Sequence, residues 1–339
     1  MQKIIDDFIK HKQLTQASIT QNTSNSYSND LGNFLLFLKL RNITKFKYID
    51  RNLLDEYYSS DIFNVYKRQW KDKTGKVVKT FDANRSEASK SRIVSSISSL
   101  FKYLIFKDIL KESPIYKRIS NPRTIESQTL TKKEINQIFK YLDSKDFSEK
   151  NKHFKYHKRD RCIIETLYFC GLRVSELVQI RMSDLKLKKA TPFIYIRGKG
   201  NKVREQPIPH HKNLIDYIDN ERNEILNSKK CDFLFANFYN NEPKRFTRQA
   251  IDKKIKRICE LALGEMNIKK DGSVKYKKIS PHMFRHSIGS HMHDSGVDLI
   301  RVKEHLGHSS VSTTSRYVKS FKKKEDILEK YGPISGSEK

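Results

Sequence analysis

The sequence has few of the features that mark secreted, disulfide-bonded or membrane-spanning proteins. Its 339 residues include four cysteines, Cys162, Cys170, Cys231 and Cys259, and none of them forms a C-x-x-C pair. This spacing argues against a zinc site and a disulfide framework, so we expect the cysteines to be small buried apolar residues. No apolar run approaches the ~18 residues that a transmembrane helix needs, and the first residues lack the apolar stretch of a signal peptide. We therefore expect a cytoplasmic protein without membrane contact.

Acidic residues are also scarce for a chain so rich in basic ones. The sequence has 68 Lys+Arg against 39 Asp+Glu, a formal net charge of +29. A surface of this charge attracts phosphate backbones through the release of counterions. A coding bias towards A+T raises the lysine content, but it does not explain why compensating acids are missing. The composition therefore predicts a polyanionic partner, DNA or RNA.

The length suits about two domains. In the first, residues 1–118, apolar residues recur at helical spacing in two stripes, each of which marks an amphipathic helix. One stripe is Tyr27, Leu31, Phe34, Leu35 and Leu38, and the other is Ile93, Ile97, Leu100, Phe101 and Leu104. We expect the two helices to pack together. Arg85, Lys90 and Arg92 lie outside the stripes and are candidates for DNA contact, with an ordinary solvated surface as the alternative.

Between these helices, residues 66–81 place aromatic and β-branched residues on both sides of a KTGK turn at 73–76. The pattern predicts a basic β-hairpin inserted in the helical domain. The hairpin could contact DNA, a neighbouring protein or only solvent.

The pattern changes after Pro114, and residues 119–129 are predicted to be a linker. Thr131 and Glu134 then form a capping box before Ile135, so a second domain, residues 130–339, should open with a helix. The expected fold is mainly α with a small β-sheet: a helical domain followed by a mixed α/β domain.

The second domain contains an arginine at a helix junction. Residues 161–169 form an apolar helical pattern that ends at Gly171, where a left-handed conformation is expected. Arg173 follows, and Glu176 is placed three residues later to hold its guanidinium by a charge-assisted hydrogen bond. A surface helix cap is the alternative for an arginine in this position.

A lysine stands at the tip of a second predicted β-hairpin. Residues 193–197 and 203–208 read as strands on both sides of the turn GKGN at 198–201. The turn lacks the spacing of a Walker A loop. Lys199 is the candidate for a DNA contact beside a phosphate, and Lys202 is the competing lysine.

Histidines follow in two further segments. Ser280 as N-cap and Pro281 at the first helical position predict a helix that places His282 and Arg285 on one face, where both can reach one phosphate. His282 and His286 also have the spacing of a zinc pair. Because no H-E-x-x-H glutamate and no clear third ligand accompany them, we expect no metal site.

His308 lies where a helix is expected to break, and Tyr317 follows nine residues later. With these two, the order arginine, lysine, His-x-x-Arg, histidine and tyrosine is complete. This order resembles the tyrosine recombinase (phage integrase-like) family over roughly Leu130 to Tyr331. The residues that make up the motifs are most like those of the Xer type, and the length of the chain and the spacing of the motifs are most like those of the single-recombinase XerH branch.

The resemblance implies a fold and a role for each residue. The first domain would be a SAM-like core-binding domain that clamps one face of DNA, and the second would be the catalytic domain. Tyr317 would be the nucleophile, and His282 would assist removal of its proton. Arg173 and Arg285 would stabilise the pentavalent transition state.

His308 would donate a hydrogen bond to a phosphoryl oxygen, and Lys199 would protonate the leaving 5′ oxygen. The product would be a 3′-phosphotyrosyl enzyme and a free 5′ hydroxyl. The exchange of one phosphodiester for another of similar energy needs no cofactor, nucleotide or metal.

The resemblance also implies partners. They are a double-stranded DNA recombination site and three further copies of the chain, which form a tetramer with exchanged C-terminal tails and a Holliday junction. A DNA translocase is a candidate activator, and chromosome dimer resolution is the expected role. The alternatives are the integrase of a mobile element, a type IB topoisomerase and a DNA-architectural protein without catalytic activity.

Overall fold

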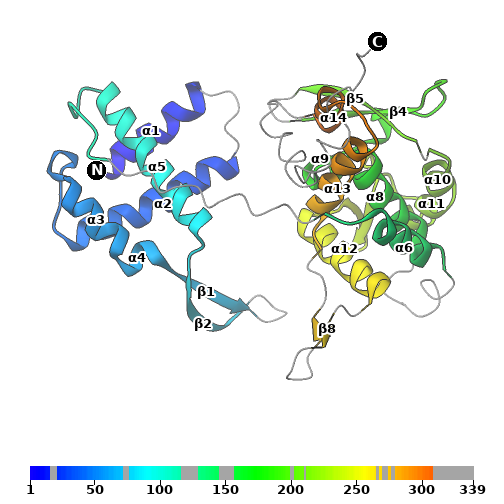
Figure 1. Cartoon of the computed structure of the whole chain (residues 1–339), viewed down its shortest axis with the longest axis horizontal. Coiled ribbons are helices and arrows are strands. Elements are labelled where there is room, and N and C mark those ends of the chain that lie inside the picture. The colour runs from blue at the N-terminus through cyan, green and yellow to red at the C-terminus, as the bar shows by residue number, and fades with distance from the viewer. Residues whose placement is uncertain are drawn as a thin grey trace, which may run out of the picture. The chain divides into compact units, whose positions relative to one another are not determined.

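The computed structural model describes residues 1–15, 21–71, 76–115, 129–144, 156–198, 202–209, 211–264, 267–268, 274–275 and 279–307. The chain divides into two compact units, Met1–Ile125 and Glu126–Lys339. Both are mainly helical, and the sheets among the described residues have two or three antiparallel strands each (Figure 1). The predicted fold class, mainly α with small β-sheets, is confirmed.

The first unit is built around the two helices that the apolar stripes predict. They are α2 (Gln21–Leu40) and α5 (Glu87–Phe106), which contact each other. The other elements are α1 (Gln2–Thr15), a 3-10 turn (Phe46–Tyr48), α3 (Arg51–Ser59) and α4 (Asp61–Asn64). Leu31, Phe34 and Ile97 are completely buried between them. Burial of one such side chain stabilises the fold by about 1.5–3 kcal/mol.

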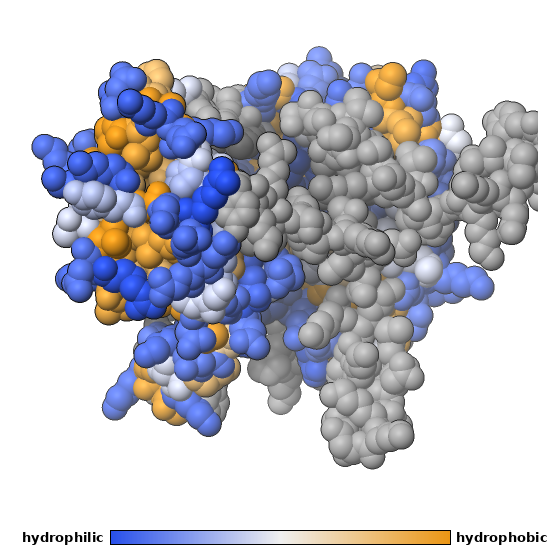
Figure 2. All heavy atoms as spheres, turned by 60° about the vertical axis from the view of Figure 1, so that its left-hand side comes forward, coloured by the Kyte–Doolittle hydropathy of each residue, from blue (hydrophilic) through white to orange (hydrophobic). Residues whose placement is uncertain are grey.

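A two-stranded ribbon projects from these helices, as Figure 1 shows. Its strands, β1 (Val65–Lys71) and β2 (Val77–Asn84), pair antiparallel, which confirms the predicted hairpin. The Arg68 guanidinium lies 5.8 Å from the centre of the Phe81 ring. The surface of the ribbon mixes hydrophilic and hydrophobic side chains (Figure 2), and its exposed apolar residues are Tyr66, Val77, Val78 and Phe81.

The second unit opens with α6 (Lys132–Asp143), whose Thr131–Glu134 capping box is present as predicted. The next helices are α8 (His157–Phe169) and the short α9 (Val174–Leu177). They are followed by α10 (His211–Asp216), a π-helical turn (Tyr217–Glu221), α11 (Arg222–Leu226), α12 (Arg248–Leu263), α13 (Pro281–Asp294) and α14 (Leu299–Leu306). Because α8 contacts α6, α10 and α13, most of its residues are buried and it forms the centre of this unit.

The strands of the second unit are short. A 3-10 turn (Met182–Asp184) leads into a three-stranded sheet of β3 (Leu185–Lys186), β4 (Phe193–Arg197) and β5 (Val203–Pro207). Two further hairpins pair β6 (Ala236–Tyr239) with β7 (Glu242–Arg245) and β8 (Asn267–Ile268) with β9 (Val274–Lys275). The β4–β5 hairpin is the one that the sequence predicts around the GKGN turn.

Three of the four cysteines, Cys162, Cys170 and Cys259, are buried free thiols as expected, and Cys231 is half-buried. Among the described helices, none is long and apolar enough to cross a membrane.

Candidate active site

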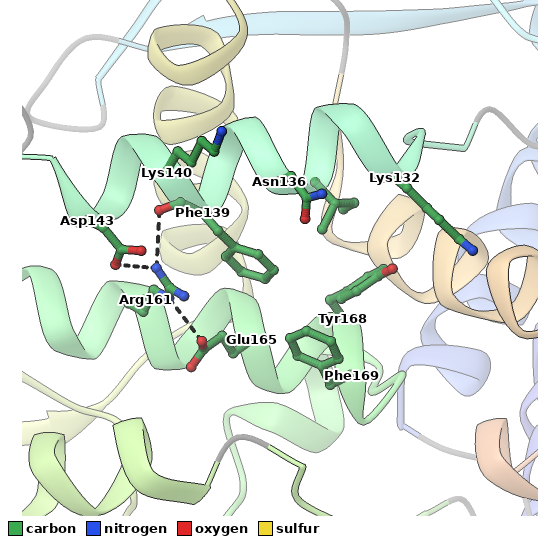
Figure 3. Close-up of a pocket in the computed structure, with 10 residues that line it drawn as sticks. Lys132, Asn136, Phe139, Lys140, Asp143, Arg161, Glu165, Tyr168 and Phe169 are labelled. Carbon is green, nitrogen blue, oxygen red and sulfur yellow. Dashed lines mark hydrogen bonds and ion pairs between the residues drawn. The ribbon is translucent and has the colours of Figure 1, made fainter.

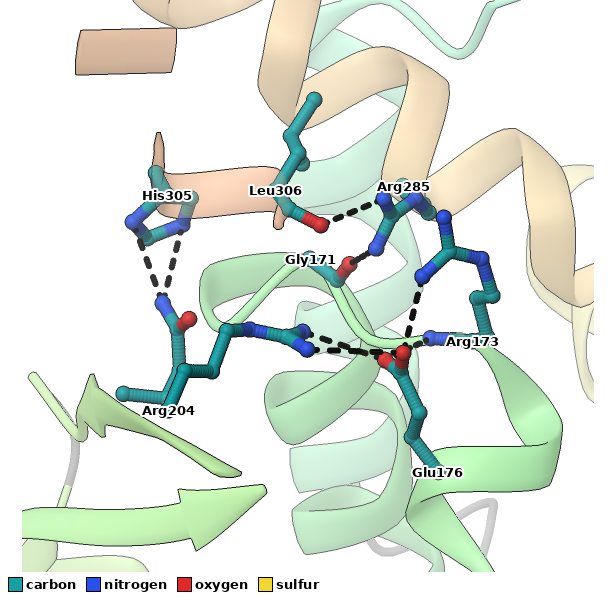
Figure 4. A network of polar contacts seen from close by, with 8 residues as sticks. Gly171, Arg173, Glu176, Arg204, Arg285, His305 and Leu306 are labelled. Atoms are coloured by element: carbon teal, nitrogen blue, oxygen red, sulfur yellow. Dashed lines mark hydrogen bonds and ion pairs between the residues drawn. The ribbon is translucent and has the colours of Figure 1, made fainter. Parts of the chain in front are cut away.

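Arg285 is the largest fully buried side chain among the described residues, with 1% of its surface exposed. It projects from α13 and donates hydrogen bonds to the carbonyl oxygens of Gly171 and Leu306 (Figure 4). Both carbonyls lie at helix C-termini, where backbone oxygens lack intrahelical partners and the helix dipole favours a positive charge. These contacts compensate the cost of burying a cation and fix the guanidinium in one position.

Gly171 has the left-handed conformation that the sequence predicts, with φ of 58°. A Cβ atom at this position would lie 2.6 Å from Leu306 Cδ2, so space as well as backbone conformation requires glycine. The close approach brings the end of α8 against the end of α14. It thereby places the two carbonyls that hold Arg285.

Arg173 occupies the N-cap position of α9, and its side chain is 41% exposed. Its Nη1 donates to Glu176 Oε1 at 2.8 Å, and its backbone N–H donates to Glu176 Oε2 at 3.0 Å. The ion pair that the i+3 spacing predicts is therefore present. One face of the guanidinium is fixed by a carboxylate, and the exposed part can meet a ligand.

A second arginine, which we did not predict, also binds Glu176. Arg204 on β5 donates from Nη2 to Oε2 at 3.1 Å and from Nη1 to Oε1 at 3.4 Å (Figure 4). Burial would raise the pKa of Glu176, but the hydrogen bonds and charges of Arg204 and Arg173 outweigh it and lower the pKa. Glu176 is therefore an anion held between two cations.

His282 lies on α13, one helical turn before Arg285, as predicted. Its pKa is lowered, first by partial loss of hydration and then by the positive charges of Arg285 and Arg173. Both arginines are thus close enough to His282 to repel a proton from it. A lowered pKa keeps the imidazole neutral at neutral pH, where it can accept a proton.

The start of α13 departs from one detail of the prediction. Ser280 is the N-cap residue and Pro281 the first helical residue, as expected, but the Ser280 side chain makes no capping hydrogen bond to a described residue. Of the other three histidines on this helix, His286 lies edge-on against the His282 ring, with 4.4 Å between ring centres. His291 Nδ1 lies 2.8 Å from the Tyr168 hydroxyl and so supports packing on α8.

The strand β5 reaches the end of α14 as well as Glu176. The Gln206 Nε2 group donates to His305 Nδ1 at 3.1 Å, and His305 Nε2 lies 2.9 Å from the carbonyl oxygen of Phe169. A neutral ring with its proton on Nε2 satisfies both contacts. Burial is the main reason why the pKa of His305 is lowered, which agrees with this neutral form.

Register explains why a polar side chain faces inward here. Arg204 pairs with Ile196 and Gln206 with Ile194, and both isoleucines are buried. Directly opposite residues of an antiparallel pair share a face of the sheet. Burial alternates along residues 203–206, but the residue types Val-Arg-Glu-Gln do not, so the sequence carries no periodic signal for Arg204 and Gln206.

Three of the predicted catalytic residues, Lys199, His308 and Tyr317, lie outside the described residues. The structure shows the elements that lead to them. The β4–β5 hairpin is closed by a hydrogen bond from Gly198 N–H to Lys202 O of 2.8 Å, directly beside Lys199. The helix α14 ends at Gly307, with φ of 62°, directly before His308, so the predicted helix break is confirmed. Lys202 itself is exposed.

The basic residues predicted to contact DNA in the first unit have partners within the chain. Lys90 forms an ion pair of 2.9 Å with Glu87. Arg92 binds the buried carboxylate of Asp30, to which Ser96 Oγ also donates at 2.8 Å. Arg85 lies over the Tyr66 ring at 5.9 Å. The three positions stay predictions as DNA contacts.

A pocket of about 490 Å³ lies between α6 and α8, away from these residues. Phe139, Tyr168 and Phe169 line it, and Arg161 at one end binds Glu165 and Asp143 (Figure 3). The Arg161 guanidinium also lies 4.8 Å from the centre of the Phe139 ring. The pocket is apolar in the middle, and the ion pairs of Arg161 with Asp143 and Glu165 lie at one end.

Comparison with known proteins agrees with the motif order. Residues 128–324 match the Phage integrase family. The chain is 30% identical over 321 residues to "Tyrosine recombinase XerD" of Staphylococcus haemolyticus (strain JCSC1435), an alignment that covers 94% of each chain.

Two solved structures share the fold. The XerH site-specific recombinase bound to a palindromic difH substrate aligns with a TM-score of 0.68 at 20% identity, covering 96% of this chain and 94% of that one. A lambda integrase tetramer bound to a Holliday junction aligns with a TM-score of 0.60 at 15% identity, covering 95% and 79%. At such identities the likeness is one of fold, so the XerH branch stays a prediction.

The matched segment, residues 128–324, includes every position of the predicted arginine, lysine, histidine and tyrosine series. The XerD relative extends the similarity over the helical first unit as well. The chain therefore belongs to the phage integrase family and is a site-specific tyrosine recombinase of the Xer type.

Proposed function

We propose that this recombinase cleaves DNA by attack of Tyr317 on a phosphodiester held between Arg173 and Arg285. The observation that supports this most is that Arg285 donates a hydrogen bond to the carbonyl oxygen of Gly171, two residues before Arg173 in the chain. Two guanidiniums from different elements, one fixed by helix-end carbonyls and one by Glu176, therefore act on one small region. A pentavalent phosphorane carries its extra charge on non-bridging oxygens, which this arrangement suits.

The proton transfers follow from the same residues. The Tyr317 oxygen forms a bond to phosphorus as the bond from phosphorus to the 5′ oxygen breaks. Neutral His282 accepts the phenol proton, and Lys199 supplies a proton to the leaving oxygen. His308 donates a hydrogen bond to the phosphoryl oxygen. The resulting 3′-phosphotyrosyl bond is attacked by the 5′ hydroxyl of another strand, so the step is reversible and needs no metal or cofactor.

We further propose that the enzyme works as a tetramer on two DNA sites and resolves chromosome dimers. The support is the Xer type of the chain and its fold likeness to a lambda integrase tetramer on a Holliday junction. The first unit, with boundaries near 1–118, would be the core-binding domain, and its candidate contacts are Arg85, Lys90 and Arg92. The reaction takes place on chromosomal DNA in the cytoplasm, where a translocase is a candidate activator.

One experiment tests the nucleophile and the role together. Wild-type protein and the Tyr317→Phe variant are expressed in the native cells. The cells are lysed in SDS, and the DNA that stays bound to the recombinase is sequenced. We expect the wild type to retain DNA from one chromosomal site and the Phe variant to retain none. An adduct with the Phe variant would refute Tyr317 as the nucleophile, whereas reads from the ends of a mobile element would indicate an integrase. With purified protein, a chelator should leave adduct formation unchanged.

A further inference from the structure

We propose that Arg204 is a positioning residue for cleavage, which neutralises Glu176 so that Arg173 can act on the DNA phosphate. The inference rests on the proposed function of Arg173. Glu176 is buried, with 5% of its side chain exposed, and it accepts hydrogen bonds from Arg173 and Arg204 on both carboxylate oxygens. Arg204 is more buried than Arg173, with 20% of its side chain exposed against 41%.

The arrangement has an electrostatic consequence. If Arg173 were the only partner of Glu176, the two charges would cancel and the pair would present little field to a phosphate. With Arg204 on the other side of the carboxylate, the three groups keep one positive charge in excess. The exposed member of the three is Arg173, so the excess is presented where a phosphate can approach. Burial strengthens the effect because the interaction between charges grows as the effective dielectric constant falls.

Arg204 is also in contact with the turn that leads to the candidate residues His308 and Tyr317. A Cβ atom on Gly307 would lie 2.9 Å from Arg204 Cζ and Nε, so the glycine backbone lies directly on the guanidinium. Two residues further along β5, Gln206 holds His305 on α14. The strand that follows the Lys199 turn therefore contacts both the support of Arg173 and the end of α14. A shift of Arg204 would therefore disturb Glu176, Gly307 and the end of α14.

The test measures the rate of covalent adduct formation and the DNA affinity of purified variants on the captured recombination site. We expect Arg204→Gln to slow cleavage by ~10–10²-fold, less than the ~10²–10³ for loss of a donor that touches the transition state, because Arg204 acts through Arg173. DNA affinity should change by less than about threefold. Arg204→Lys, which keeps the charge without the fork, should recover most of the rate.

The decisive measurement is a double-variant cycle. If Arg204 serves to neutralise Glu176, it has no charge left to neutralise in a Glu176→Gln background. The Glu176→Gln/Arg204→Gln enzyme should then be within about threefold of Glu176→Gln alone. Losses that multiply in the double variant would show that Arg204 acts independently of Glu176, and the proposal would be wrong.

Arg161→Gln is the matched control, because Arg161 is 19% exposed and pairs with Glu165, which is 6% exposed, outside the site. We expect it to lower thermal stability about as much as Arg204→Gln and to leave the cleavage rate of folded protein unchanged. Equal slowing in both variants would mean a general effect of stability and would overturn the inference. A wild-type enzyme that forms no Tyr317 adduct would instead refute the proposed function, so the two failures are distinguishable.

Discussion

At the scale of single residues, Arg285 and Arg222 show one solution to the burial of an arginine. Arg222 is also buried, and its guanidinium donates to the carbonyl oxygens of Cys231, Phe233 and Leu234. The oxygens that bind Arg285 lie at helix C-termini and lack intrahelical partners, whereas those that bind Arg222 lie in the segment between α11 and β6. The contacts of Arg222 serve the fold. Arg285 differs because its charge reaches His282 and lies in the same region as that of Arg173.

Arg285 and Arg222 together give a prediction in which Arg222 is the control. Arg285→Gln and Arg222→Gln each leave buried carbonyl groups without a cationic donor, so each should destabilise the protein by about 1–3 kcal/mol in thermal or chemical unfolding. Arg285→Gln should in addition slow adduct formation by ~10²–10³-fold at saturating DNA. Arg222→Gln should cleave at the wild-type rate once its folded fraction is taken into account. Equal cleavage rates in the two variants would contradict a catalytic role of Arg285.

The sequence predicted contacts between neighbours in the chain better than contacts between elements. The pair of Arg173 and Glu176 follows from a spacing of three residues on one helical turn, and the left-handed Gly171 follows from the end of an apolar helix. Arg204 is 28 residues from Glu176, so no local spacing reveals that contact. Ser280 was predicted correctly as an N-cap position, but its side chain makes no capping hydrogen bond to a described residue.

At the scale of elements, α2 and α5 were predicted from one long apolar stripe each, and α6 from the capping box at its start. The hairpins followed from alternating residues on both sides of a turn. The packing of β5 against the end of α14 could not be predicted, because it depends on residues about a hundred positions apart, such as Gln206 and His305. Such contacts arise from the tertiary fold and leave no periodic signal.

The β4–β5 hairpin leads to a prediction about Lys199. The hydrogen bond from Gly198 N–H to Lys202 O closes the paired strands, and Lys202 directly precedes β5, whereas Lys199 falls between Gly198 and Lys202 in the sequence and outside the described residues. Lys199→Ala should therefore cleave slowly on normal DNA and recover on DNA whose bridging 5′ oxygen is replaced by sulfur, because a thiolate leaves without a proton. Lys202→Ala should need no rescue. If sulfur leaves Lys199→Ala as slow as before, the lysine has another role.

At the scale of the whole molecule, the charge of +29 predicts the class of partner but not the positions that bind it. Lys90 and Arg92 show why, since each is already bound to a carboxylate of the same unit. A lysine or arginine counts equally in the net charge whether it is paired or exposed. The division into two units and the order of motifs were accessible from the sequence, whereas the pairing of Arg92 with Asp30, 62 residues away, depends on the tertiary fold.

The last prediction concerns assembly of the whole recombinase and the residues that follow Tyr317. Ile327, Leu328 and Tyr331 lie outside the described residues, and their spacing would place them on one face of a helix. So short an apolar face does not stabilise an isolated helix in water, so we expect it to dock on protein.

We predict that this surface is on the next protomer of the tetramer. A chain truncated after Lys324 should then stay folded and bind a half-site in a mobility-shift assay, yet fail to pair two sites and to exchange strands. Truncation after Gly332, which keeps the apolar face, is the control and should recombine normally. If the tail docked on its own catalytic domain instead, the main effect of truncation after Lys324 would be a lower thermal stability of the monomer, and not a loss of site pairing. Recombination of two full sites at the wild-type rate by the shorter chain would show that the tail is dispensable for assembly.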